Sequence, residues 1–207
     1  GICNERYTEA LAEEPIYARS YERSQAQFKK AREVIPLGAQ TFSKSHLQYP
    51  QPSPLFLSHG DGGLAWDIDG KEYLDFFPGW AVSGIGHCHP KVVAAVNKQA
   101  NKLLHVSNNY YSELQAKLAG EIIKNSFPGK VFFSNSGAEA NEAAVKLARF
   151  YGHYKGRFEI ITMTKSFHGR TLAMIAATGQ DKVKKGFEPL PAGFIHVPFN
   201  DLEAVKE

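Results

Sequence analysis

The feature that most constrains the fold of this sequence is a change of pattern near residue 90. From there on, segments with apolar residues at helical spacing alternate with short apolar runs typical of buried strands. Strands that alternate with helices predict a mostly parallel sheet with helices on both faces, which is the α/β class. The predicted helices are 90–104, 112–123, 138–151, a short one from about 171 and one capped by Asn200 or Asp201; the predicted strands are 130–134, 158–163 and 194–197.

The part before residue 90 has a different organisation. Residues 1–35 are polar and helical in pattern, and the clearest helix, 21–35, is followed by a loop that is rich in Gln, Ser and Pro. Short β segments are predicted at 55–57, 64–68 and 72–76, the last two joined by a hairpin turn at Asp69-Gly70. We therefore predict a helical and β segment over residues 1–78 and an α/β domain over residues 79–207.

Composition excludes several classes of protein. The chain has 207 residues, of which 43% are hydrophobic and 22% are charged, values that are ordinary for a globular protein. The net charge of +3 is spread along the chain, so we expect no nucleic-acid partner. No apolar run approaches the ~20 residues that would cross a bilayer, so we expect no membrane partner. The two cysteines, Cys3 and Cys88, match no metal or redox spacing, which favours a reducing, cytoplasmic setting.

The segment 131–146 has the pattern of a buried strand that runs through a short turn into an alanine-rich helix. The N–H groups of Gly137 and Ala138 would then lie at the positive end of the helix, where an anion such as a phosphate binds. The alternative is purely structural, with Ser136 as the N-cap and Glu139 completing a capping box. The spacing of glycine and lysine fits neither a Walker loop nor a dinucleotide-binding fingerprint. Both interpretations stay open on the sequence.

A second segment, 164–171, follows directly after a predicted strand. Loops at the carboxyl ends of strands line the ligand crevice of an open α/β sheet, so Phe167, His168 and Arg170 would share a site with Gly137. An aromatic face can stack on a planar ring, and a guanidinium can bind a carboxylate through two hydrogen bonds. Taken singly, Phe167 is also explained by core packing and Arg170 by a surface ion pair.

The third segment, 80–90, contains Trp80 and ends in His87, Cys88 and His89. Neighbouring side chains on an extended backbone point in opposite directions, and no further ligand stands at metal-binding spacing, so we expect no metal. The glycines instead predict a tight turn into a helix that begins at Pro90.

These three segments together resemble the class-III, pyridoxal-phosphate-dependent aminotransferases of fold type I. The resemblance extends from about Pro54 to Glu207, and its strongest points are the motifs Gly-His-Cys-His-Pro, Asn-Ser-Gly-Ala-Glu-Ala-Asn-Glu-Ala and Ser-Phe-His-Gly-Arg-Thr. Within the class, segments 105–111, 176–179 and 197–201 are most similar to acetylornithine and ornithine aminotransferases. Segment 28–42 and Trp80 are more similar to glutamate-1-semialdehyde aminomutases.

The resemblance implies specific roles. Residues 79–207 would form the N-terminal part of the large domain that binds pyridoxal 5'-phosphate. The cofactor-binding residues would be Ser136, Gly137 and Ala138 at the phosphate, with Phe167 stacked on the pyridine ring beside His168. Substrate binding would fall to Arg170, on the carboxylate of the amino acid or 2-oxo acid, and to Trp80, at the substrate entrance.

The resemblance also implies what these 207 residues do not contain. The family's Schiff-base lysine, the aspartate that pairs with the pyridine nitrogen and a second substrate arginine would all lie beyond Glu207. We therefore expect no catalytic residue in this chain, and we expect the chain to be inactive by itself. Members of the family are usually homodimers, so the expected partner is a second copy or a complementing chain. Two other classes remain open: a non-catalytic aminotransferase-like subunit, and a different phosphate-ligand α/β protein such as a nucleotide-binding module.

Overall fold

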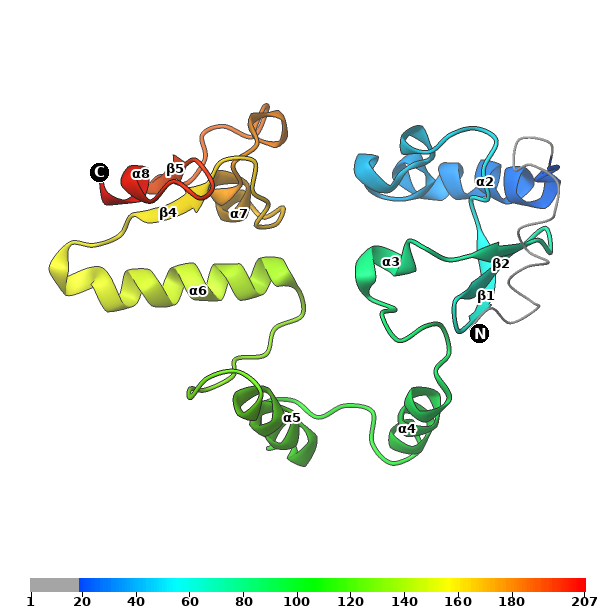
Figure 1. Cartoon of the computed structure of the whole chain (residues 1–207), viewed down its shortest axis with the longest axis horizontal. Helices are drawn as coiled ribbons and strands as arrows, with labels where there is room; N and C mark the ends of the chain where they lie inside the picture. Colours follow the sequence, from blue (N-terminus) through cyan, green and yellow to red (C-terminus); the bar gives the residue numbers. More distant parts are fainter. Residues whose placement is uncertain (1–18) are drawn as a thin grey trace. The chain divides into compact units, whose positions relative to one another are not determined.

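The computed structural model describes residues 19–207, which divide into two compact units, one ending at Asn109 and one beginning at Tyr110 (Figure 1). The helical pattern predicted before residue 19 and Cys3 lie outside the described residues. Taken together, helices, a parallel strand pair and a small antiparallel sheet confirm the α/β class, with a sheet that is only partial.

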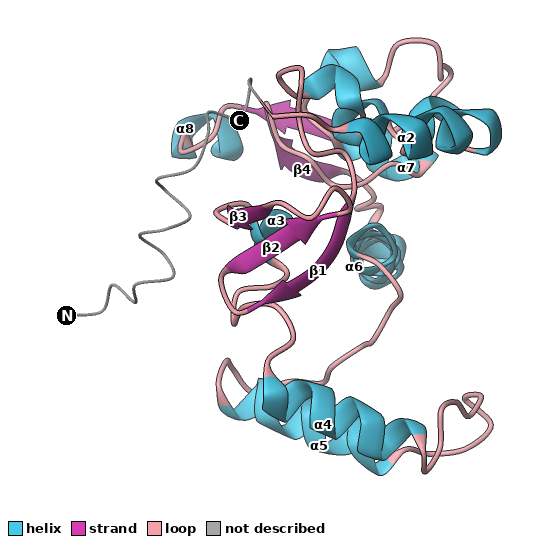
Figure 2. Cartoon of the chain, turned by 90° about the vertical axis from the view of Figure 1, so that its right-hand side faces the viewer, coloured by secondary structure: helices cyan, strands magenta, loops and turns pink. Residues whose placement is uncertain are grey.

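The first unit combines one helix with a small antiparallel sheet. Helix α2 spans Glu22–Val34 and ends before three short 3-10 turns at Pro36–Gly38, Phe42–Lys44 and His46–Gln48. The sheet contains β1 (Leu57–Asp61), β2 (Leu64–Asp67) and β3 (Glu72–Leu74) in that order, with both pairings antiparallel (Figure 2). The turn at Asp69-Gly70 joins β2 to β3 as predicted.

The turn between β2 and β3 binds the N-terminus of α2. The Asp69 carboxylate accepts the backbone N–H of Arg23 at 2.7 Å, and both the backbone N–H (3.0 Å) and the hydroxyl (2.7 Å) of Ser24. Because the first N–H groups of a helix have no partner within the helix, this carboxylate acts as a cap supplied by a distant part of the chain.

Asp67, the last residue of β2, is a buried polar residue. Its carboxylate accepts the Lys71 N–H at 2.8 Å and the Tyr73 hydroxyl at 2.7 Å. Burial, together with hydrogen bonds to Tyr21 and Asp67, raises the pKa of Tyr73. A buried polar group of this kind is tolerated because its hydrogen bonds are made.

The unit continues into two more helices. Short helix α3, Pro78–Ala81, contains left-handed backbone at Gly79 and at Trp80. Helix α4, Pro90–Ala100, begins at Pro90 as predicted and ends four residues before the predicted limit.

The second unit carries the alternating elements. It contains α5 (Glu113–Lys124), α6 (Gly137–Gly152), β4 (Ile160–Met163), α7 (Leu172–Ala177), β5 (Phe194–Val197) and α8 (Leu202–Lys206), with short 3-10 turns at His153–Lys155 and Asp181–Val183. Strands β4 and β5 pair in parallel, Ile160 opposite Phe194 through Met163 opposite Val197. Helix α7 forms much of the core of this unit, because four of its residues, Met174, Ile175, Ala176 and Ala177, are buried.

The strand predicted at 130–134 is wrong. The segment has no strand structure, and Phe132 is 74% exposed. An extended segment becomes a strand only when a neighbouring strand satisfies its backbone groups, and no described strand pairs with it.

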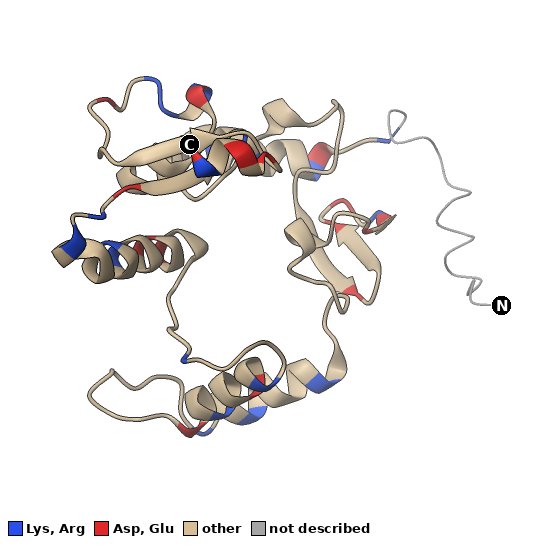
Figure 3. Cartoon of the chain, turned by 60° about the vertical axis from the view of Figure 1, so that its left-hand side comes forward, with Lys and Arg blue, Asp and Glu red and all other residues tan. Residues whose placement is uncertain are grey.

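Helices α2, α5 and α6 carry charges of both signs, and Figure 3 shows basic and acidic residues in both units. Over residues 19–207, no helix combines the length and the apolar character that crossing a membrane requires. The same residues contain no group of three or more His, Cys, Asp or Glu side chains placed to hold a metal ion.

Candidate functional site

Helix α6 begins at Gly137, directly after the N-cap residue Ser136. The Ser136 hydroxyl accepts the Glu139 N–H at 3.2 Å, as expected for the N-cap. The Glu139 carboxylate accepts the N–H of Asn135 at 2.6 Å. In the predicted capping box it would accept the N–H of Ser136, one residue later. Helix geometry leaves the N–H groups of Gly137 and Ala138 without partners inside the helix. A side chain at Gly137 would meet nothing within 4 Å, so there is room for an anion there.

The segment 164–171 lies directly against this end of α6. Gly169 has a φ of +133°, and a Cβ added there would stand 2.7 Å from the Cβ of Ala138 and 3.2 Å from the Cβ of Met174. Only a glycine allows the loop to approach the helix so closely. The structure therefore brings together, within one unit, the helix N-terminus and the loop that carries Phe167, His168 and Arg170.

Phe167 and Arg170 contact each other on the surface of this unit. The Phe167 side chain is 57% exposed, which is incompatible with the alternative of core packing. The guanidinium carbon of Arg170 lies 5.3 Å from the centre of the Phe167 ring, a cation–π contact. His168 is half-buried, with its Nδ1 atom 3.4 Å from the Ser166 hydroxyl. An exposed aromatic face and an exposed guanidinium thus belong to the loop that lies against the N-terminus of α6.

Side chains that the sequence did not single out hold this loop in place. The His168 N–H donates to the Thr178 hydroxyl oxygen at 3.0 Å, and the Asn141 amide donates to the His168 carbonyl oxygen at 2.8 Å. The Thr171 hydroxyl donates to the Glu142 carboxylate at 2.5 Å and caps α7 by accepting the Met174 N–H. The signal for Asn141 and Glu142 was present in the sequence, because they lie one helical turn after Ala138 on α6.

Trp80 belongs to the other unit. Its ring is exposed and meets the Phe77 ring edge-on at a centroid distance of 5.3 Å. The backbone of Trp80 has a φ of +62°, a left-handed conformation that is unusual for a bulky residue.

His87, in the His-Cys-His segment, contacts a carboxylate that the sequence pattern did not predict. Nε2 of His87 lies 2.6 Å from Oδ2 of Asp75, and the backbone of His87 makes two hydrogen bonds with Gly62. Cys88 is exposed, with a left-handed φ of +49°. The contact between His87 and Asp75 could not be predicted from the sequence, because it depends on how the two ends of the loop that contains Trp80 meet in the fold.

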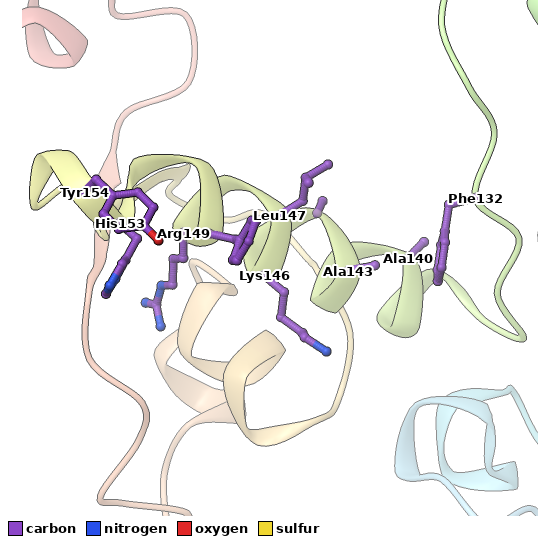
Figure 4. A pocket seen from close by; sticks show the side chains of 10 residues that line it. Phe132, Ala140, Ala143, Lys146, Leu147, Arg149, His153 and Tyr154 are labelled. Atoms are coloured by element: carbon purple, nitrogen blue, oxygen red, sulfur yellow. The ribbon is translucent and has the colours of Figure 1, made fainter.

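A separate hollow of about 1090 Å³ is lined mainly by residues of α6 (Figure 4). Apolar residues dominate its lining, and Lys146 and Arg149 also reach it. Leu147 and Phe150 are 69% and 77% exposed, so this side of the helix presents a continuous apolar surface.

Comparisons with known proteins agree on one family. The family model described as aminotransferase class-III matches residues 47–207. An acetylornithine aminotransferase of Myxococcus xanthus is 54% identical over 170 residues, which cover 80% of this chain and 42% of that protein. The corresponding protein of Caldanaerobacter subterraneus is 55% identical over 157 residues, covering 74% of this chain and 40% of its own length. The chain thus spans about two fifths of the length of these relatives.

Solved structures give the same result. An ornithine aminotransferase from Toxoplasma gondii superimposes with a TM-score of 0.75 at 25% identity, over 98% of this chain and 44% of that one. An N-acetylornithine aminotransferase from Stenotrophomonas maltophilia superimposes with a TM-score of 0.59 at 38% identity, over 77% of this chain and 39% of that one. With a family model over more than half of its residues, this chain belongs to the class-III aminotransferases.

Proposed function

We propose that this chain forms the cofactor-phosphate and substrate-carboxylate part of an aminotransferase that moves an amino group from acetylornithine, ornithine or a similar amino acid to 2-oxoglutarate. Class-III aminotransferases depend on pyridoxal 5'-phosphate. The observation that carries the proposal is the close approach of Gly169 to Ala138, which places the Phe167 and Arg170 loop against the N-terminus of α6. The choice of amino donor follows the acetylornithine aminotransferases that are more than 50% identical to this chain.

The residues present fit the cofactor. The N–H groups of Gly137 and Ala138, with the Ser136 hydroxyl, would bind its phosphate in the open space beside Gly137. The exposed ring of Phe167 would stack on its pyridine ring, with His168 beside it. When bound, the cofactor supplies an electron sink for breaking a bond at the substrate Cα.

Arg170 is the residue that would orient the substrate. Its guanidinium is exposed and offers paired N–H donors that match a carboxylate. Trp80 is proposed as a further substrate-binding residue on the resemblance alone. The chain spans about two fifths of its relatives, and the lysine that holds the cofactor in this family is proposed to lie beyond Glu207, so we propose that these residues alone do not transaminate.

A single pair of variants tests the phosphate site. Gly137 is the first residue of α6, where proline is tolerated, so Gly137→Pro removes one N–H donor while the helix is retained. Glu113→Pro makes the same change at the first residue of another helix, α5. We expect Gly137→Pro to weaken binding of pyridoxal 5'-phosphate by about tenfold, and Glu113→Pro to leave it unchanged, in a spectroscopic titration. Equal affinities for all three proteins would contradict the assignment.

A second experiment tests the reaction. The chain is mixed with pyridoxal 5'-phosphate, with and without the downstream sequence of a relative, and treated with borohydride. An absorbance band that borohydride fixes only when the downstream sequence is present supports the proposal. Nucleotide binding without any response to pyridoxal 5'-phosphate would favour a nucleotide-binding module, and cofactor binding without turnover in either mixture would favour a non-catalytic subunit.

A second candidate reaction rests on Trp80. Its bulky side chain and the segment 28–42 favour a glutamate-1-semialdehyde aminomutase-like activity, in which the amino group moves within one substrate. Product analysis with and without an added 2-oxo acid separates the two reactions, because only the aminotransferase needs the acceptor.

The setting of the reaction is proposed on the same grounds. We propose a cytoplasmic enzyme that acts as a homodimer or with a complementing chain. We also propose that residues 1–78 and 79–207 act as the small and large domains. The compact units of the structure divide elsewhere, between Asn109 and Tyr110.

A further inference from the structure

Both polar groups of the His168 main chain, the N–H and the carbonyl oxygen, form hydrogen bonds with side chains. Its N–H donates to the hydroxyl of Thr178 at 3.0 Å, and its carbonyl oxygen accepts the side-chain amide of Asn141 at 2.8 Å. Because each peptide unit is planar, fixing these two atoms fixes the two peptide planes on either side of His168. The direction in which the neighbouring Phe167 side chain leaves the backbone is therefore fixed as well.

The two holding residues come from different helices. Asn141 lies on α6, one turn beyond Ala138, so it ties the loop to the same helix that presents the anion-binding N–H groups. Thr178 is the C-cap of α7 and is fully buried. A buried hydroxyl is retained at low cost only where it makes hydrogen bonds, and the hydroxyl oxygen of Thr178 accepts the His168 N–H.

Gly169 adds a third constraint. Its contact with Ala138 sets how near the loop approaches α6, while Asn141 and Thr178 set how the loop is turned. Phe167 itself is 57% exposed and its ring contacts the Arg170 guanidinium of the same loop, so the position of the ring depends on how this loop is held.

We propose that Asn141 and Thr178 are positioning residues that hold the Phe167 ring at a defined distance and angle from the N-terminus of α6. This rests on the proposed function, in which one ligand carries a phosphate for the helix and a planar ring for Phe167. Asn141 and Thr178 then raise the affinity for ligands that carry both a phosphate and a planar ring. They do not change the affinity for inorganic phosphate.

The test compares two ligands on the full chain. Pyridoxal 5'-phosphate uses the helix end and the ring, whereas inorganic phosphate uses the helix end alone. The affinity for pyridoxal 5'-phosphate is measured by spectroscopic titration, and that for inorganic phosphate by the shifts of the Gly137 and Ala138 amide signals in nuclear magnetic resonance spectra.

Two variants remove the hydrogen bonds, and each has a matched control. Thr178→Val removes the acceptor, and Thr178→Ser retains it. Asn141→Ala removes the donor, whereas Asn125→Ala removes a side-chain amide that donates to the carbonyl of Glu121, away from this loop. We expect Thr178→Val and Asn141→Ala to weaken pyridoxal 5'-phosphate by about tenfold and to leave inorganic phosphate unchanged. Both controls should bind both ligands as the unsubstituted chain does.

Every other outcome of these measurements contradicts either this inference or the proposed function. Unchanged affinity for pyridoxal 5'-phosphate in folded Asn141→Ala and Thr178→Val shows that the pair does not position the ring. Equal losses for both ligands show a general structural role, which also overturns the proposal. If Thr178→Val fails to fold, Asn141→Ala alone decides, because Asn141 is half-buried on a long helix. If the unsubstituted chain binds neither ligand, both the proposed function and this inference are overturned. If it binds both ligands, a negative result with the variants overturns this inference alone.

Discussion

Arg170 is the residue to which the proposed function assigns the substrate carboxylate. Its guanidinium lies over the ring of Phe167, and both side chains are exposed on the loop between β4 and α7. The planar fork of arginine can stack on an aromatic ring and bind a carboxylate through two N–H groups at once. A lysine at this position would retain the charge and lose that geometry.

We therefore expect Arg170→Lys to raise the KM for the carboxylate substrate by about tenfold or more in an active form of the enzyme, with a smaller effect on kcat. Steady-state kinetics with varied substrate measure the change. Arg157→Lys, an exposed substitution in the same unit, serves as the control. An unchanged KM would remove Arg170 from this role.

Asp75 and His87 form the other informative pair of residues. Asp75 also accepts the N–H of Phe77 at 2.9 Å, so its carboxylate ties together both ends of the loop that contains Trp80. Asp75→Ala should lower the free energy of unfolding by about 1–3 kcal/mol, because two hydrogen bonds of a partly buried carboxylate are lost. Urea denaturation measures the change, and Asp61→Ala on exposed β1 is the control. Equal effects of the two substitutions would show that the pair adds no stability.

At the scale of elements, α2 and the hairpin of β2 and β3 stabilise each other through Asp69. Desolvation by burial raises the pKa of Asp69, but the hydrogen bonds from Ser24 and Arg23 outweigh it, so the pKa lies below its ordinary value. A carboxyl group with a lowered pKa in the folded state stabilises the protein above its unfolded pKa, and this stabilisation is lost as the pH falls through its folded pKa.

Asp69→Asn should thus reduce the free energy of unfolding near neutral pH by an amount that shrinks as the pH falls below about 4. Denaturation at a series of pH values measures the difference between the variant and the unsubstituted chain. Asp61→Asn should show a small difference at every pH. A difference for Asp69→Asn that grows on acidification would contradict this account.

The elements also show which parts of the structure the sequence determines locally. The caps of α5 by Ser112, α6 by Ser136 and α8 by Asp201 were predictable, because a capping side chain and its N–H partner lie within three residues. The cap of α2 by Asp69 and the contact of Asp75 with His87 were not, since each depends on how distant segments meet. The strand at 130–134 failed for a related reason: its apolar residues fit a strand, but the described residues offer it no pairing partner.

At the scale of the candidate site, the sequence placed Gly137, Ala138, Phe167 and Arg170 near one another by a general rule about strand ends. The structure adds the reason that they meet closely, which is the absence of a side chain at Gly169. Asn141 lies within the motif 135–143 and Thr178 within the segment 176–179, but only their hydrogen bonds to His168 show that they hold the loop.

For the molecule as a whole, the apolar hollow along α6 is the feature most relevant to its behaviour in solution. Its volume of about 1090 Å³ and the exposure of Leu147 and Phe150 make it a surface on which apolar dyes and other apolar groups bind. Figure 4 shows the lining side chains spread along the length of the helix, from Phe132 to Tyr154.

The chain should accordingly bind the dye 8-anilinonaphthalene-1-sulfonate while folded. Leu147→Gln together with Phe150→Gln should lower the dye fluorescence and change the free energy of unfolding by no more than about 0.5 kcal/mol, because both side chains are already exposed. Lys117→Gln on α5, an exposed lysine outside the lining of the hollow, is the control and should leave the fluorescence unchanged. Undiminished dye binding in the double variant would place the apolar site elsewhere.

The contact between Asp69 and the first turn of α2 has a consequence for the order in which the chain opens. The carboxylate and its partner Ser24 are 45 residues apart, so the helix receives this acceptor only after the turn between β2 and β3 has closed. The first turn of α2 and this turn should therefore open in one cooperative step and exchange their amide hydrogens together. An isolated helix end would fray, but this one is protected for as long as the hairpin is formed.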